Sequence, residues 1–528
     1  MGLLLFAFLF FVHLCAAQES LPDRCGTGER FGTDLIKRLK SGKLLATRPT
    51  LPYSVEVMKG AFRIHYDTTG PNAVDPRDTD RNGLPDYIDH VAAAFEHAWR
   101  VEIDTLGYLP PPSDGTDGGS SALDVYVRNL GPTGYYGITS PDRMIRQSPT
   151  ELWTTFLEID NDYSATDSTS NGRPSYTTTG LDALRITCAH EFHHAVQNGS
   201  YASRSEQRML YELTSTWMEM RCWPDVRDWA YYASALLNRP ATWPLSRSSA
   251  QTGYVWGWFG NVLSTLPGNV LRSTWDRIGK GTLPFAALVD ACAASGTPIN
   301  DAFCIAVEAM YRTGSRGASN AILPGASELP EIAVSSPIEV VGTGSTLTGS
   351  MAPFEVRAFR FNLTNPLGAR ASADAIISLT DGRVLAIDSL RDRYLAYELS
   401  LSSAPSSSDV PISSTGWGVR TRPDAHCLLV EGIALLENGI IFPQPLDLSS
   451  TQTLYVPVGG AQIGDSVEIS ILDLAMRPVQ QAQQATISIV ERRIVASVTI
   501  SPDIPPGPYL LFVDDRRNQP TMQKIFIR

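Results

Sequence analysis

The chain has 528 residues, 43% of them hydrophobic and 19% charged, which is ordinary for globular protein and enough for about three domains. Its formal net charge at pH 7 is −12. Because nucleic acids and anionic membranes are bound through clustered Lys and Arg, this balance argues against either as a partner.

The first seventeen residues predict an export signal. The run LLLFAFLFFVHLCAA is apolar, ends in small residues and is too short to span a bilayer comfortably, and we expect cleavage after Ala17. Leu14 directly before Cys15 makes this run a poor match to a lipoprotein signal. Since no other stretch is long and apolar enough for a membrane helix, we expect a secreted or cell-surface protein without a transmembrane span.

The next part of the chain predicts an α+β domain. Residues 18–50 show little periodicity and are expected to form a lead-in, and the sequence leaves open whether it is a removable pro-segment. Alternating apolar and polar residues predict strands at 62–67, 122–130 and 154–162. Helical patterns cover residues 87–108, 181–197 and 206–221 and continue to about Arg312. We place this domain at residues 51–321.

The segment DTDRNGLPDYID predicts a calcium loop just before the first of these helices. Gly83 stands sixth in it, where the chain must turn sharply, and the twelfth residue is Asp rather than the longer Glu. Without an entering helix the loop resembles the calcium loops of exported bacterial modules, and a solvated acidic turn is the alternative. The expected ligands are the side chains of Asp78, Asp80, Asn82, Asp86 and Asp89 and the carbonyl of Leu84.

The segment ITCAHEFHHAVQNG contains three of the eight histidines within five positions. His190 and His194 are four residues apart, so on a helix their side chains lie about 6 Å apart along the axis and can take two corners of a zinc site. Glu191 is placed to act as a general base, as in H-E-x-x-H motifs. His193 faces elsewhere on such a helix. The alternatives are a chance occurrence of the motif and a solvated histidine-rich helix face.

A third protein ligand is required if water is to keep one zinc position. Glu212 and Glu219 on the predicted helix 206–221 are the two candidates, and Glu212 is our choice, with Thr216 one turn away as a hydrogen-bond partner for a ligand. Glu219 is expected to support a ligand or to be a solvated charge at the helix end. Tyr254, on a glycine-flanked segment, is a candidate oxyanion donor. The competing tyrosines are Tyr231 and Tyr232.

From about Ile322 the chain becomes rich in Ser, Thr, Pro and Gly and contains short alternating runs. We expect two β-sandwich-like modules, residues 322–440 and residues 441–528. The predicted fold class is therefore α+β, with one mixed domain followed by two β modules.

Six cysteines follow the export signal, at positions 25, 188, 222, 292, 304 and 427. An even number in an exported chain suggests disulfides. The expected pairs are Cys188–Cys222 and Cys292–Cys304, because each would join neighbouring helices. Buried thiols without disulfides are the alternative.

These motifs resemble those of a known family. HEFHH, followed by ELTST on the next helix, resembles the gluzincin metallopeptidases, in which a glutamate on the following helix completes the zinc site. More closely, residues 60–275 resemble a group of exported bacterial metallopeptidases. Six segments carry that resemblance in the same order: FRIHYDTTG, DTDRNGLPDYID, GYYG, DNDY, CAHEFHHAVQ and GWFGN.

The resemblance implies a zincin-like fold, in which the motif helix lies beneath the edge strand of a twisted sheet above a helical lower half. It implies His190, His194 and Glu212 as zinc ligands and Glu191 as the base. Many gluzincins have a small or acidic residue where this chain has Thr216. This difference leaves open which side chains hydrogen-bond to the zinc ligands, but it does not affect the ligands themselves.

The last ninety residues resemble the C-terminal sorting domain that Bacteroidetes-type bacteria use for secretion. A P-G-x-Y turn and a basic-apolar final strand carry this resemblance, and a plain β spacer is the alternative. Taken together, we expect a secreted zinc-dependent endopeptidase acting on protein or peptide substrates, with structural calcium and a tail for the secretion machinery. A surface adhesin on an inactive zincin scaffold is the alternative.

Overall fold

The computed structural model describes residues 21, 23–31, 36, 47–204, 207–365, 370–379, 394–412, 417–422, 427–433, 446–449, 452–457, 465–490, 493–514 and 521–528. The expected export signal and most of the lead-in lie outside these residues. The architecture is mixed α+β, as predicted. Among the described helices, none combines the length and apolarity needed to cross a membrane.

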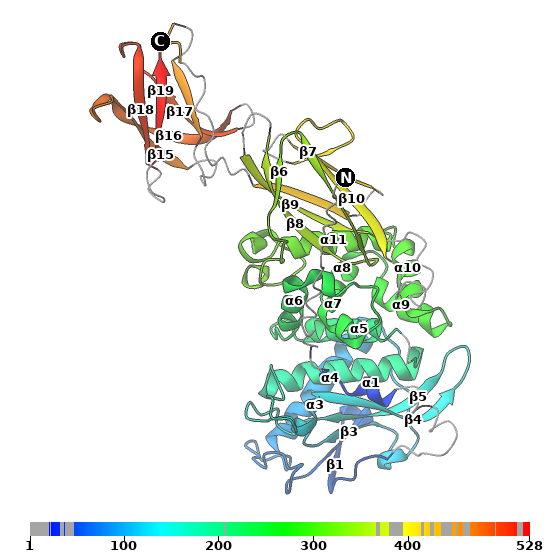
Figure 1. The fold of residues 1–528 in the computed structure, drawn as a ribbon. Coiled ribbons are helices and arrows are strands. Elements are labelled where there is room, and N and C mark those ends of the chain that lie inside the picture. Colours follow the sequence, from blue (N-terminus) through cyan, green and yellow to red (C-terminus); the bar gives the residue numbers. More distant parts are fainter. Residues whose placement is uncertain are drawn as a thin grey trace, which may run out of the picture. The chain divides into compact units, whose positions relative to one another are not determined.

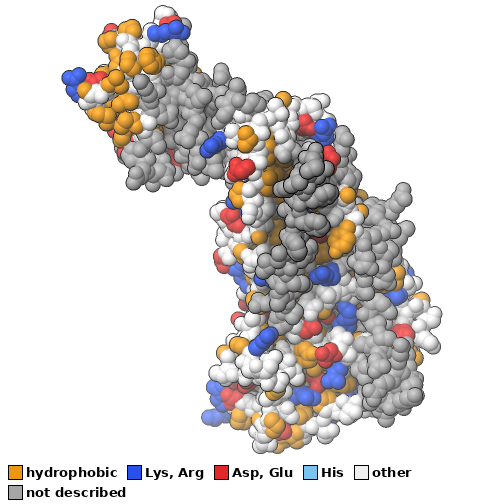
Figure 2. Space-filling view, in the orientation of Figure 1, with side chains coloured by type: hydrophobic (Ala, Val, Ile, Leu, Met, Phe, Trp, Pro, Cys, Tyr) orange, Lys and Arg blue, Asp and Glu red, His pale blue; other side chains and the backbone are white. Residues whose placement is uncertain are grey.

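The chain divides into two compact units. The first comprises Met1–Thr105, Leu109–Arg146 and Glu151–Ser205, and the second comprises Leu106–Tyr108, Gln147–Thr150 and Glu206–Arg528. On the face shown in Figure 2, acidic and basic side chains of the described residues are interspersed, without a continuous basic surface.

A five-stranded sheet in the order β1-β2-β3-β5-β4 forms the centre of the first unit (Figure 1). The three parallel strands are those that the sequence predicted, whereas β1 and β4 are antiparallel to their neighbours and were missed. β4 lies at the edge of the sheet, and it includes Pro141, which weakens its strand signal. The strand bounds are β1 Tyr53–Val57, β2 Phe62–Tyr66, β3 Leu123–Val127, β4 Gly137–Arg146 and β5 Leu152–Ile159.

Two helices of this unit contact each other and the sheet. They are α3, Asp86–Trp99, and α4, Gly180–Val196, which matches the predicted motif helix. Every residue of α4 from Ile186 to Val196 is buried. A helix buried on all sides must provide partners for its polar side chains, so its histidines and glutamate cannot form a solvated face. The interpretation of the motif as a solvated helix face is therefore wrong.

A short helix, α1 (Thr27–Arg30), belongs to the segment that precedes the sheet. Cys25 forms an isolated parallel bridge with Gly137, at the first residue of β4. The Gly26 amide donates to the Gly137 carbonyl at 3.0 Å, and the Tyr136 amide donates to the Arg24 carbonyl at 2.7 Å. This segment therefore pairs with the chain where the edge strand begins.

The second unit begins with helices that the sequence largely predicted. Within the helical pattern that continues to about Arg312, residues 250–265 form two helices that break at Gly257–Trp258. At Gly253 a Cβ atom would lie 2.5 Å from the Glu212 Cβ, so only glycine allows α7 to approach α5 this closely. The helices are α5 Arg208–Cys222, α6 Trp229–Asn238, α7 Ala250–Trp256, α8 Phe259–Thr265, α9 Val270–Gly279, α10 Pro284–Ala294 and α11 Ile299–Tyr311.

Two four-stranded sheets follow, in the orders β11-β12-β10-β7 and β13-β9-β8-β6. They share one core, to which Phe361 contributes from one sheet and Leu399 from the other. Phe354 packs against the helices, with ring centroids 5.5 Å from Phe285 and 5.2 Å from Phe303. The strands are β6 Ile338–Val341, β7 Gly344–Met351, β8 Arg357–Thr364, β9 Arg370–Ser378, β10 Leu395–Ser402, β11 Val410–Pro411, β12 Gly418–Arg422 and β13 Cys427–Ile433.

The last strands form one six-stranded sheet in the order β14-β17-β16-β15-β18-β19. The long strand β16 pairs with β15 through its first part and with β17 through its last four residues, so the sheet bends around a single core. The strands are β14 Thr453–Pro457, β15 Ser466–Leu472, β16 Pro478–Val490, β17 Arg493–Thr499, β18 Gly507–Asp514 and β19 Thr521–Ile527.

Both predicted disulfides are wrong. Cys304 on α11 is bonded to Cys427 on β13, with a Cα–Cα distance of 5.3 Å and a separation of 123 residues. Cys25, Cys188, Cys222 and Cys292 are buried and form no disulfide among the described residues. The prediction assumed that each disulfide joins helices that are neighbours in sequence, whereas the partner of Cys304 lies on a strand 123 residues further along the chain.

Removing this disulfide is expected to lower stability substantially. A cross-link that closes so long a loop restricts the unfolded chain, and the double variant Cys304→Ser/Cys427→Ser should lose about 3–5 kcal/mol. Denaturant titration with and without reductant measures this. The ion pair of Arg312 with Glu431, 3.1 Å apart, joins the same elements. An unchanged midpoint in the double variant would show that packing and ion pairs alone hold them together.

Candidate metal centre

His190 and His194 are both buried and lie on the same face of α4. Their ring centroids are 4.7 Å apart, and the rings are inclined by 82°. One helical turn brings them together, as the spacing predicted. They therefore offer two imidazole nitrogens at a single place.

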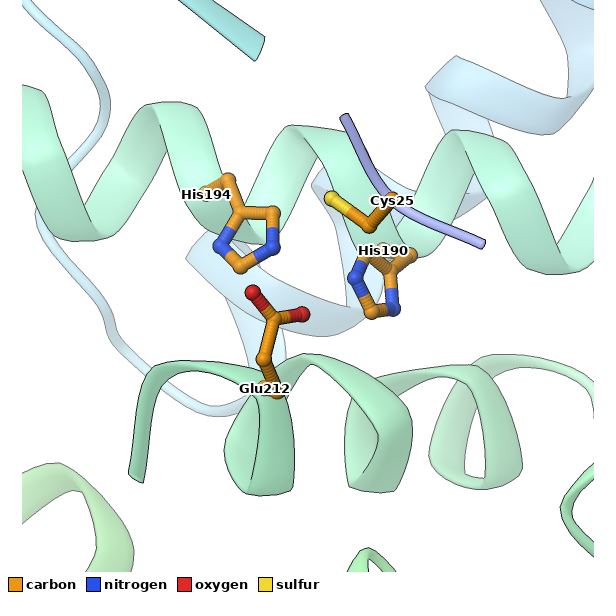
Figure 3. A group of neighbouring side chains, drawn as sticks. All are labelled: Cys25, His190, His194 and Glu212. Carbon is orange, nitrogen blue, oxygen red and sulfur yellow. The ribbon is translucent and has the colours of Figure 1, made fainter. Parts of the chain in front are cut away.

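Two further side chains join the histidines (Figure 3). One ligand atom from each of Cys25, His190, His194 and Glu212 lies within 4.8 Å of the other three, and all four residues are buried. Donors held by one tetrahedral zinc ion lie roughly 3.5 Å apart, so the group has about the size that one ion requires. Glu212, the glutamate chosen from the sequence, is the carboxylate of this group. Cys25 was not predicted to be a metal ligand.

The side chains around the ligands fit a metal. His194 Nδ1 lies 2.7 Å from Gln197 Oε1, so a proton on Nδ1 leaves Nε2 for a metal, a usual arrangement for metal-binding histidines. Arg208 donates to Glu212 Oε1 at 2.8 Å, within the same helix. Gln197 directly follows α4, and Arg208 is the first residue of α5. Both lie close in sequence to the side chains they contact, although neither was predicted.

Glu191 is 1% exposed and lies between the motif helix and β4. Its Oε2 accepts hydrogen bonds from the Thr139 hydroxyl at 2.7 Å and from the Thr27 hydroxyl at 3.0 Å. A Cβ at Gly137 would lie 2.5 Å from Glu191 Cγ, so glycine at the start of β4 makes room for this carboxylate. The base predicted from the motif is thus held by the edge strand and by the N-terminal segment.

His193 does not belong to the metal group, as predicted. Its Nδ1 lies 2.8 Å from Glu102 Oε2, and neither side chain is exposed. Burial raises the pKa of Glu102 well above its usual range. Burial also lowers the pKa of His193, to which His194 and His190 add a smaller effect. Burial therefore favours a neutral, hydrogen-bonded pair. This pair anchors α4 to the helical residues Arg100–Thr105, which directly follow α3.

The other residues singled out in the sequence, Glu219, Thr216 and three tyrosines, differ in burial. Glu219 is 3% exposed, so its interpretation as a solvated helix-end charge is wrong. Thr216 is fully buried, and its Cγ2 would lie 2.4 Å from a Cβ at Gly257. Tyr254 is 1% exposed on α7, with its ring 5.5 Å from that of Tyr232, whereas Tyr231 is 44% exposed. The role of Tyr254 as an oxyanion donor stays a prediction.

The acidic loop forms a compact turn before α3. Asp78, Asp80 and Asp86 have oxygens within 4.8 Å of one another, while the Asn82 amide donates to Asp89 at 3.0 Å. Gly83 has a φ of +90°, a conformation that favours glycine, at the sixth position, where a sharp turn was predicted. Asp78 accepts hydrogen bonds from the backbone amides of both Asn82 and Gly83. The carboxylates fit a hard cation such as Ca²⁺, and calcium binding stays a prediction.

Calcium is expected to raise the melting temperature of the zinc-loaded protein. At a Ca²⁺ concentration 100 times its dissociation constant, the gain is about 2.7 kcal/mol. Asp80→Ala should lose most of this gain, and Asp104→Ala, at an exposed position outside the loop, should keep it. Thermal unfolding with added Ca²⁺ tests this, and an equal gain in both variants would contradict a site in this loop.

Comparison of the chain with models of known protein families, with curated proteins and with solved structures gives no match.

Proposed function

We propose that this chain is an exported zinc-dependent endopeptidase. The observation that carries the proposal is the group formed by His190, His194 and Glu212, with the buried carboxylate of Glu191 next in sequence to the first histidine. Two imidazoles and a carboxylate are the protein ligands of many catalytic zinc sites. The resemblance of the motifs to gluzincins agrees with this donor set, and we propose a zincin-like fold for the region that carries them.

The residues of the chain have separate roles in this proposal. When bound, zinc supplies a Lewis acid that polarises the peptide carbonyl and acidifies a water molecule. Glu191 takes the proton from the attacking water and passes it to the leaving amine. The hydroxyl of Thr139 on β4 orients the Glu191 carboxylate. Gln197 fixes the ring of His194, and Arg208 holds the side chain of Glu212.

The remaining parts are assigned to export and stability. The apolar N-terminus is proposed as the export signal and the acidic loop as a structural calcium site. The six-stranded C-terminal sheet is proposed as a sorting domain for secretion or surface attachment. These assignments rest on the sequence motifs described above.

Zinc content and cleavage of unfolded casein, with and without a chelator, test the peptidase function. We expect bound zinc and chelator-sensitive cleavage, to be measured both in the natural chain and in a Cys25→Ser variant. A protein that binds zinc but cleaves no unfolded protein in either form would instead favour an adhesin on an inactive scaffold.

A further inference from the structure

The N-terminal segment that contains Cys25 makes three contacts that bear on the proposed active site. The first is with the edge of the sheet, where the backbones of Arg24 and Gly26 bond to Tyr136 and Gly137. An extended peptide that adds to a sheet edge uses the same backbone groups. Residues 24–26 therefore occupy the start of an edge that an extended peptide could otherwise use.

The second contact is with the metal ligands. The Cys25 sulfur is a member of the group formed with His190, His194 and Glu212, and the residue is 5% exposed. Zinc binds cysteine thiolates as readily as imidazoles. A structural zinc site is closed by four protein donors, whereas a catalytic site keeps one position for water. With Cys25 in place, the donor set is that of a closed site.

The third contact is with the proposed base. Thr27 donates its hydroxyl proton to Glu191 Oε2 at 3.0 Å, while the Thr139 amide donates to the Thr27 oxygen at 2.7 Å. Thr27 is fully buried, so this contact excludes solvent from that side of the carboxylate. The hydroxyl occupies an oxygen on which the base would receive its proton.

A buried cysteine alone is a common packing feature. Here, however, four consecutive residues contact the sheet edge, the ligands and the base, and these are the three features that peptide hydrolysis would use. We propose that residues 24–27 keep the enzyme latent, with Cys25 as the fourth zinc ligand. Cleavage or displacement of the segment exchanges the thiolate for a water molecule, and the thiolate takes up a proton from solvent without any oxidation. This inference rests on the proposed peptidase function.

Cobalt substitution tests the ligand directly. The full chain loaded with Co²⁺ should show the near-ultraviolet charge-transfer absorption of a cobalt–thiolate bond, and Cys25→Ser should lose it. Cys292→Ser, a buried cysteine on α10 outside the group, is the matched control and should keep it. Loss of the absorption in the control, or its persistence in Cys25→Ser, would overturn the assignment.

A second measurement needs no variant. X-ray absorption of the zinc-loaded natural chain should detect one sulfur at about 2.3 Å from the metal. A shell of nitrogen and oxygen alone would overturn the inference even if Cys25→Ser fails to fold.

Casein cleavage separates this inference from the peptidase function. Cys25→Ser should cleave at least tenfold faster than the unprocessed natural chain, whereas Cys292→Ser should match that chain. Equal rates in Cys25→Ser and the natural chain would refute latency. A sulfur ligand with no cleavage in any form would refute the peptidase, and cleavage without a sulfur ligand would refute only the role of Cys25.

Discussion

Glu191→Gln is expected to lower casein cleavage by about 10²–10⁴-fold while zinc content stays unchanged. The amide has nearly the shape of the carboxylate and can still accept a hydrogen bond from Thr139, but it cannot take a proton from water. Cleavage and zinc content should be measured both in the natural chain and in the Cys25→Ser background, where the proposed latency is absent.

Glu96→Gln is the matched control, because Glu96 pairs with Arg100 on the exposed side of α3. We expect its cleavage rate and zinc content to equal those of the parent. Full activity in Glu191→Gln would end the proposal that this residue is the base. A simultaneous loss of zinc would mean that it acts on the metal site instead.

Glu212→Gln is expected to weaken zinc binding by more than the 10–100-fold that a change beside a ligand costs. A neutral amide is a poor zinc donor, although it keeps the shape of the side chain and an acceptor for Arg208. Activity should fall with metal occupancy. Competition with a chromophoric chelator measures the affinity, and added zinc should restore part of the cleavage.

Glu219→Gln provides the comparison on the same helix. Glu219 is buried but does not contribute a ligand atom to the metal group. We expect less than a tenfold change in zinc affinity. If Glu219→Gln bound zinc more weakly than Glu212→Gln, the wrong glutamate would have been assigned as the ligand.

Much of the fold followed from periodicity. The buried strands β2, β3 and β5 and the helices α4 and α5 have strong, regular patterns, and the structure contains each of them close to its predicted bounds. The edge strands β1 and β4 were missed. β1 has the alternating pattern YSVEV and could have been predicted, whereas β4 contains a proline that weakens its strand signal.

That the two histidines share a face was predictable, because their spacing on one helix places them one turn apart. Helix spacing did not separate Glu212 from Glu219, and the choice of Glu212 rested on the length of chain after His194 and on the resemblance to gluzincins. Cys25 was not predictable, because only tertiary pairing of its segment with β4 brings it to the histidines. The Cys304–Cys427 bond escaped prediction for the same reason, since 123 residues separate its ends. Local patterns determine elements, whereas contacts between distant segments depend on how those elements pack.

The packing of Phe354 affects how a shorter version of the protein should be designed. A fragment ending at residue 321, the limit expected from composition, would leave the rings of Phe285 and Phe303 without this neighbour and would expose apolar surface to water. It would also leave Cys304 as an unpaired thiol able to cross-link molecules during purification. A fragment extended through residue 433 keeps both features intact and is the better choice for crystallisation.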